Sequence, residues 1–194
     1  LARKIYELTQ DLDWSKIEEG RLELSQRPTS IDTLIREIVN TYSSVASSKS
    51  LVLWQHTDSQ LSPVHMVDGL RLSQILNNLV SNAIKFTHKG EVEIRAKLLE
   101  QVFGGEKIKF SVKDSGIGIP KEAQQRLFQS YSQENSDTAR MYGGTGLGLS
   151  ICRSLAELMH GEISVESELG QGSTFSITMT LPVTNEPAEK TQGL

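Results

Sequence analysis

Two glycine-rich segments carry residue types that can bind a nucleotide. Segment 144–148 (Gly-Thr-Gly-Leu-Gly) opens an amphipathic helix, so its backbone amides and the positive end of the helix dipole can hold phosphate groups. Asp114 ends a strand-like stretch and precedes Gly116 and Gly118, which let a flat ring approach a carboxylate that accepts a hydrogen bond from an amino group. A glycine hinge without a ligand and an aspartate in a tight turn are the alternatives for each segment alone.

The spacing of these glycines excludes two other phosphate-binding motifs. No Gly-Lys-Ser/Thr follows segment 144–148, so it is not a P-loop. The same segment follows no predicted strand, so it is not a dinucleotide-binding fingerprint.

A third candidate is the polar face of a helix predicted between Asp68, a start signal, and Gly90, a stop signal. Apolar residues recur at helical spacing on its other face. The polar face holds no acid, and its centre consists of carboxamides, which are neutral oxygen ligands for a hard cation. A surface helix with unusual polar residues is the alternative. The polar positions are Arg71, Gln74, Asn78, Asn82 and Lys85.

The remaining periodicity predicts the elements that must position these residues. Hairpins connect most neighbouring strands, which disfavours a doubly wound parallel sheet. We therefore expect an α/β two-layer sandwich: a mixed, mostly antiparallel sheet with helices on one face, preceded by a helical segment. The expected strands are 22–29, 51–56, 64–67, 91–98, 107–113, 162–167 and 173–181, and the other expected helices are 1–20, 30–50, 120–128 and 148–160.

Composition limits the kind of protein. The 194 residues are 37% hydrophobic and 23% charged, as in ordinary soluble domains, and the formal net charge is −4. No basic run suggests a nucleic-acid or membrane-surface partner, and no apolar run has membrane-spanning length. Because the chain starts at Leu1 without Met, we expect a fragment of a longer protein. The single cysteine, Cys152, is expected to fill the core, with a reactive thiol as the alternative.

Four motifs in order resemble the N, G1, F and G2 boxes of sensor histidine kinases. They are Asn82 with Lys85 and Phe86, the segment 114–118 (Asp-Ser-Gly-Ile-Gly), Leu127 with Phe128, and the segment 144–148. The resemblance extends over residues 11–183 and implies a Bergerat-type ATP-binding fold. It divides the chain into the end of a dimerisation helix (1–20), an ATP-binding catalytic domain (21–183) and a linker or tail (184–194).

The resemblance also implies ATP and Mg²⁺ as cofactors and gives roles to individual residues. Asn82 would bind the metal, and Arg140, in the loop that covers the nucleotide, would stabilise charge on the transferring phosphoryl group; a solvated arginine is the alternative. That loop departs from the family pattern at Ser130 and Tyr131, which puts its geometry in doubt. The nucleotide-binding residues would be Asn78, Asn82, Lys85, Phe86, Asp114, Gly116, Gly118, Phe128, Gly144, Thr145, Gly146, Leu147 and Gly148.

The phospho-acceptor histidine of this family is expected upstream of Leu1. None of the four histidines has the family's acceptor context, an acid next to the histidine and a proline shortly after. The expected partners are the protein's own dimerisation helices, which form a homodimer in the parent protein, and a response regulator or receiver domain. By resemblance, the domain is cytoplasmic and its parent is anchored in the bacterial inner membrane.

Two other functions remain as alternatives. Hydrolytic relatives of this fold carry a glutamate one helical turn before the metal-binding asparagine, as a general base for water. Here that position is Asn78, which cannot take a proton, so the sequence favours phosphoryl transfer over ATP hydrolysis. A kinase-like ATP-binding module that acts by pairing with a partner kinase is the second alternative.

Overall fold

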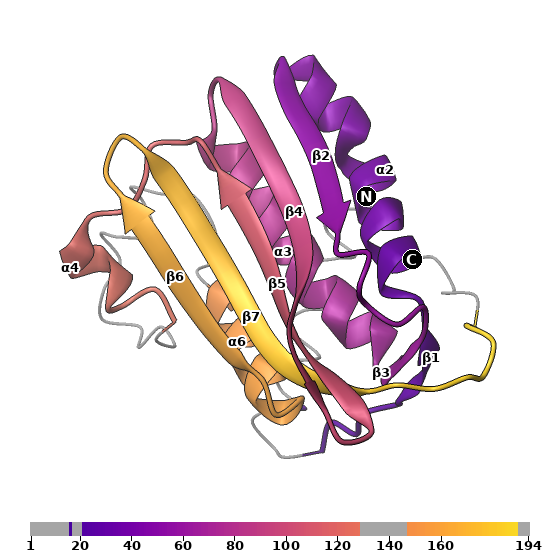
Figure 1. The fold of residues 1–194 in the computed structure, drawn as a ribbon. Coiled ribbons are helices and arrows are strands. Elements are labelled where there is room, and N and C mark those ends of the chain that lie inside the picture. Colours follow the sequence, from indigo (N-terminus) through magenta and orange to yellow (C-terminus); the bar gives the residue numbers. More distant parts are fainter. Residues whose placement is uncertain (1–15, 17–20, 129–146, 190–194) are drawn as a thin grey trace.

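The computed structural model describes Lys16 and residues 21–128 and 147–189; the side chain of Leu147 is not included (Figure 1). The rest of the predicted N-terminal helix, the loop with Arg140, the glycines at 144 and 146 with Thr145, and residues 190–194 lie outside the described residues. No helix in the described part is long and apolar enough to cross a membrane.

A five-stranded sheet forms one layer, in the order β2-β4-β5-β7-β6. Strand β2 runs parallel to β4, and the other neighbours are antiparallel. The predicted mixed, mostly antiparallel sheet is therefore confirmed. The strands are β2 (Leu51–Thr57), β4 (Gly90–Val102), β5 (Gly105–Asp114), β6 (Glu162–Glu168) and β7 (Gly172–Pro182). A second sheet pairs β1 (Arg27–Thr29) with β3 (His65–Val67).

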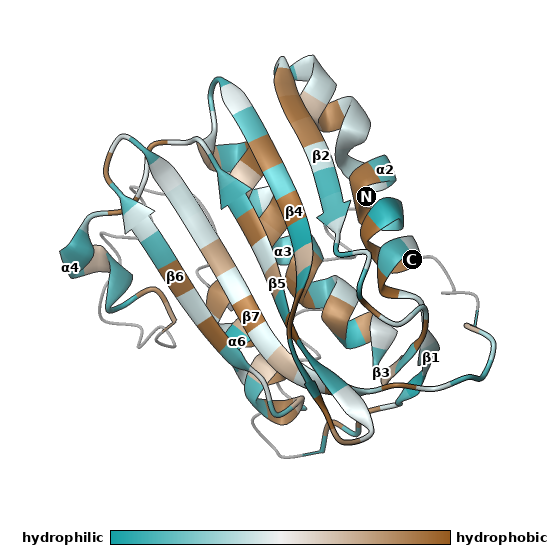
Figure 2. Ribbon diagram, viewed as in Figure 1, coloured by the Kyte–Doolittle hydropathy of each residue, from teal (hydrophilic) through white to brown (hydrophobic). Residues whose placement is uncertain are grey.

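Three long helices cover one face of the five-stranded sheet: α2 (Ile31–Ser48), α3 (Gly69–Phe86) and α6 (Leu147–Leu158) (Figure 1). A fourth, α4 (Lys121–Gln124), is a single turn. Alternate strand residues such as Ile94 and Phe110 are fully buried beneath the helices, and Figure 2 shows the resulting alternation of polar and apolar residues along β4 and β5. This is the predicted two-layer sandwich.

Several element ends differ from the sequence expectations. Helix α3 ends at Phe86, because the Thr87 hydroxyl donates to the Ala83 carbonyl (2.7 Å); Gly90, with φ +116°, begins β4 instead of ending the helix. Of the strand predicted over 22–29, only β1 (Arg27–Thr29) forms, because only these residues pair with β3. The helix predicted over 120–128 stops at Gln124 and continues as turns.

Candidate nucleotide-binding site

Helix α3 places the two central carboxamides one turn apart. Its N-cap Asp68 accepts a hydrogen bond from the Arg71 backbone N–H (3.0 Å), which fixes where the helix begins. Asn82 Nδ2 donates to Asn78 Oδ1 (3.2 Å), so the two side chains orient each other. Asn78 is 7% exposed although it lies on the predicted polar face.

Gly148 explains the burial of Asn78. A Cβ atom at this position would lie 2.6 Å from Nδ2 and 2.8 Å from Oδ1 of Asn78, so the first turn of α6 passes directly over the carboxamide. Only a glycine permits this approach. The structure thus brings the predicted Asn78, Asn82 and Gly148 together at the contact of α3 with α6.

Asp114 lies at the end of β5 and is 7% exposed. The Gly116 N–H donates to its Oδ1 (2.8 Å). Burial raises the pKa of this carboxyl above its ordinary value, although the backbone hydrogen bonds from Gly116 and Ser173 oppose the shift. One well-placed acceptor is thereby held in a largely dehydrated position, where such a group can discriminate between donors and acceptors of a ligand.

The loop after Asp114 adjoins the end of α3. The Ile117 N–H donates to the Phe86 carbonyl (3.4 Å), and a Cβ at Gly116 would lie 2.6 Å from the same oxygen. The aspartate and the last turn of α3 are therefore fixed relative to each other. Gly118 has φ +69°, and a Cβ there would lie 2.0 Å from the Glu168 carbonyl, so its glycine is required for packing against the β6–β7 turn.

Three other predicted residues lie on the last turn of α3 and in the turns after α4. Lys85 is exposed, and its Nζ lies 5.0 Å from the centre of the Phe86 ring. Phe128 packs edge-to-face against Phe175 of β7, with ring centres 6.2 Å apart.

Lys49, at the end of α2, donates to the Ile84 carbonyl (2.7 Å) and so closes the C-terminus of α3. No local pattern predicted a role for Lys49, because its contact is 35 positions away in the chain.

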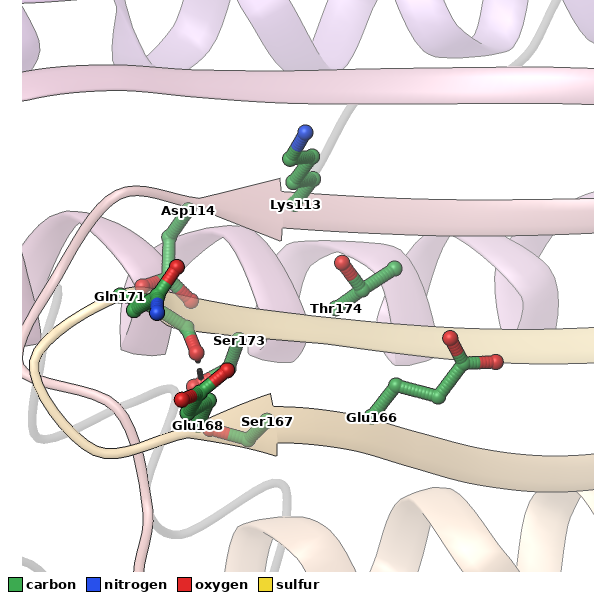
Figure 3. Close-up of a pocket in the computed structure, with 9 residues that line it drawn as sticks. Lys113, Asp114, Glu166, Ser167, Glu168, Gln171, Ser173 and Thr174 are labelled. Carbon is green, nitrogen blue, oxygen red and sulfur yellow. Dashed lines mark hydrogen bonds between the residues drawn. The ribbon is translucent and has the colours of Figure 1, made fainter.

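A hollow of about 310 Å³ lies beside Asp114, at the ends of β5, β6 and β7 (Figure 3). Its lining includes Ser167 and Ser173, but neither Asn78 nor Asn82. Ser173 stands opposite Asp114 in the β5–β7 register, a neighbour that sequence reasoning missed because only strand pairing reveals it. Arg140 and the residues numbered 144–146 lie outside the described part of the chain, so their predicted roles stay predictions.

Comparison with known proteins identifies the family. Residues 67–185 match the family described as histidine kinase-, DNA gyrase B- and HSP90-like ATPase. The sensor histidine kinase GacS of Pseudomonas protegens is 43% identical over 184 residues, which is 94% of this chain and 20% of that protein. Hybrid signal transduction histidine kinase L of Dictyostelium discoideum is 41% identical over 166 residues, 85% of this chain and 10% of the relative. The chain thus spans a fifth or less of these relatives.

Solved structures agree with this match. Full-length ShkA in complex with AMPPNP superposes with a TM-score of 0.80 at 31% identity, covering 93% of this chain and 36% of that one. The nucleotide-free catalytic domain of the histidine kinase ThkA gives a TM-score of 0.65 at 28% identity, covering 82% and 96%. The chain belongs to the histidine kinase-, DNA gyrase B- and HSP90-like ATPase family and is the ATP-binding catalytic domain of a sensor histidine kinase.

Proposed function

We propose that this domain binds Mg²⁺-ATP between α3, the loop after Asp114 and the start of α6, and donates the γ-phosphoryl group to a histidine on a dimerisation helix. The contacts of Asn78 with Asn82 and with Gly148 carry the proposal, because they join the carboxamides of α3 to the start of α6. Asp114 would accept a hydrogen bond from the adenine amino group. The bound nucleotide analogue of the ShkA structure supports the same reading.

Asn82 has the donor chemistry that Mg²⁺ requires. Its Nδ2 is occupied by Asn78, and within the described residues its Oδ1 has no hydrogen-bond partner. A neutral amide oxygen, together with phosphate oxygens and waters, satisfies this cation. We therefore propose Asn82 as the protein ligand of the metal, which would neutralise charge on the phosphates.

The chemistry at Asn78 supports transfer rather than hydrolysis. A carboxamide cannot accept a proton from water, and Asn78 is held between Asn82 and Gly148. The nucleophile would come from outside the domain, on the protein's own dimerisation helices, and a response regulator or receiver domain would then receive the phosphoryl group. An ATP-binding module that regulates a partner kinase remains the second candidate.

The Asn82→Ala variant tests the metal and nucleotide site. We expect it to lose Mg²⁺-dependent ATP binding in calorimetry while its thermal unfolding stays close to that of the wild type. Asn77→Ala is the matched control, because the hydroxyl of Tyr42 in α2 donates to the backbone carbonyl of Asn77 (3.4 Å), which the alanine retains. Unchanged affinity in Asn82→Ala would refute the assignment.

Transfer is tested with labelled ATP, Mg²⁺ and a separate dimerisation fragment. Acid-labile phosphate on the histidine of that fragment is the expected product. Binding of ATP without transfer to any acceptor helix would favour the regulatory module, and release of inorganic phosphate without an acceptor would favour an ATPase.

We further propose that residues 21–183 form the catalytic domain without residues 1–20. Among the described residues, the buried members of the hydrophobic core run from Ile31 to Leu181, and Leu22 and Leu24 only border it. Removal of residues 1–20 should leave a cooperatively folding, nucleotide-binding protein, as measured by urea unfolding and calorimetry. Loss of the cooperative transition would show that the first segment belongs to the core.

A further inference from the structure

A hydrogen-bonded junction ties α4 to the ends of β6 and β7. Gln124 uses both amide hydrogens: its Nε2 donates to the Ile119 carbonyl (2.7 Å) and to the Ser167 carbonyl (2.9 Å). In return, the Ile119 N–H donates to Ser167 Oγ (2.8 Å). Two side chains thus hold together a loop, a helical turn and a strand end.

On one side this junction reaches Asp114. Ser167 Oγ donates to the Gly172 carbonyl (2.8 Å) and lies 3.0 Å from Ser173 Oγ, as the dashed line in Figure 3 shows. Ser173 is the register partner of Asp114 in the β5–β7 ladder. A continuous path of hydrogen bonds and strand pairing therefore runs from the carboxylate to Gln124.

On the other side the junction holds α4, which leads through turns to Phe128. Helix α4 is one turn long, has no side-chain cap and contributes no buried residue. Hydrophobic contacts hold the chain on either side of α4, at Ile119, Leu127 and Phe128, whereas the side-chain hydrogen bonds of Gln124 attach the helical turn itself. Four residues after Gln124, Phe128 packs against Phe175 of β7.

We propose that Gln124 is a positioning residue for phosphoryl transfer: it holds α4 and Phe128 in register with Asp114, the aspartate proposed to bind adenine. The inference rests on the proposed nucleotide site. Gln124 itself does not contact ATP in this proposal. Loss of its side chain should therefore disturb the alignment needed in the transition state more than the binding of the base.

The test compares Gln124→Met with Gln125→Met. Methionine keeps the length of the side chain and removes both donors, and Gln125 is the exposed neighbour. For Gln124→Met we expect kcat for transfer to a separate acceptor fragment to fall about tenfold. The KM for ATP, the Kd for ADP and the melting temperature should stay close to those of the wild type, and Gln125→Met should match the wild type throughout.

Gln124→Glu adds a pH readout. An ionised carboxylate at this position faces two carbonyl oxygens, whereas its protonated form restores one donor. Its kcat relative to the wild type should therefore rise as the pH is lowered, and the Gln124→Met ratio should stay flat. If the side chain of Gln124 only fills space, the kcat ratios of Gln124→Glu and Gln124→Met should have the same pH dependence.

Two results would overturn the inference: an unchanged kcat in Gln124→Met, or a parallel loss of kcat, nucleotide affinity and melting temperature. Failure of the proposed site is recognised separately, because Asn82→Ala would then bind Mg²⁺-ATP normally. If Asn82→Ala loses binding and Gln124→Met transfers at the wild-type rate, only the positioning role is refuted.

Discussion

At the residue scale, the proposed selectivity for adenine depends on Asp114. Its carboxylate accepts the backbone N–H groups of Gly116, at Oδ1, and of Ser173, so a ligand amino group would have to meet a remaining lone pair of the carboxylate. Adenine presents such a donor, whereas guanine would present an acceptor to a buried carboxylate. An asparagine at this position has only one acceptor oxygen. That oxygen could accept a hydrogen bond from the backbone N–H or from the base, and the amide nitrogen would then face the other donor.

We therefore predict that Asp114→Asn weakens ATP binding about tenfold or more, because a hydrogen bond to a charged acceptor is lost. Burial raises the pKa of Asp114 in the folded protein, so its ionisation opposes folding above that pKa, and the cost disappears as pH falls below the ordinary value of 3.8. Stability of Asp114→Asn at pH 7 should accordingly be no lower than that of the wild type. Calorimetry and urea unfolding measure both quantities.

The pH dependence of binding provides the contrast. In the wild type, ATP affinity should decrease as acidification protonates the carboxyl, and this decrease should begin at a higher pH than for an exposed aspartate. Asp114→Asn should lack this component. Equal affinity of the variant for ATP, with retained discrimination against GTP, would contradict the assignment.

The sequence predicted the individual site residues better than their surroundings. Asn82, Asp114 and Gly148 belong to local motifs, so their types and spacing are visible in the chain. Ser173 and Gln124 were missed, because their importance depends on strand register and on a loop that returns to them. Such partners are set by tertiary structure, which periodicity does not encode.

At the element scale, the strongly periodic helices and the hairpins were predicted well, and their ends less so. Helix α3 was expected to continue towards Gly90. Instead, the Thr87 hydroxyl donates to the Ala83 carbonyl, and the Lys49 ammonium group donates to the Ile84 carbonyl. Capping by a side chain from another helix leaves no local signal. The parallel pairing of β2 with β4 likewise depends on a crossover through α3 that spacing alone does not specify.

The packing of α6 on α3 gives the prediction at this scale. Gly148→Ala would place a methyl group within 3 Å of both polar atoms of Asn78, so Asn78 or the start of α6 must move. Overpacking of this kind costs about 1–3 kcal/mol of unfolding free energy, and ATP affinity should fall as well. Urea unfolding and calorimetry are the measurements.

A double variant separates the two effects of Gly148→Ala. In an Asn78→Ala background the space is already empty, so adding Gly148→Ala should cost little further stability. ATP binding should remain weak, because the carboxamide is absent. Full additivity of the two stability losses would show that Gly148 does not act through Asn78.

At the scale of the whole molecule, a buried acid fastens the small sheet to the large one. Glu106 of β5 and His65 of β3 have side-chain exposures of 3% and 0%, and their Oε2 and Nε2 atoms are 2.8 Å apart. The backbone N–H and hydroxyl of Ser62 also donate to the Glu106 carboxylate, the hydroxyl at 2.7 Å. One carboxylate therefore joins β5, β3 and the loop that precedes β3, at the end of the sheet remote from Asp114.

The titration of Glu106 should appear in the stability of the domain. Burial alone would raise the pKa of this carboxyl, but the hydrogen bonds from Ser62 and His65 lower it below its ordinary value of 4.5. A carboxyl with a lowered folded pKa contributes stability that is fully present above the unfolded pKa and is lost as the pH falls through the folded pKa. The contribution of Glu106 should therefore be complete at pH 7 and decline below about pH 4.5.

Glu106→Gln should lower the unfolding free energy at pH 7 by about 1–3 kcal/mol, because the amide nitrogen faces donors in a buried position. The difference from the wild type should shrink as the pH falls below 4.5. Glu162→Gln, at an exposed position of β6, is the control for the substitution and should have an unfolding free energy close to that of the wild type at pH 7. Urea unfolding at a series of pH values measures this. ATP affinity should be retained wherever the variant is folded, since the small sheet lies away from the nucleotide site. A difference that is constant with pH would mean that Glu106 acts through packing and not through its charge.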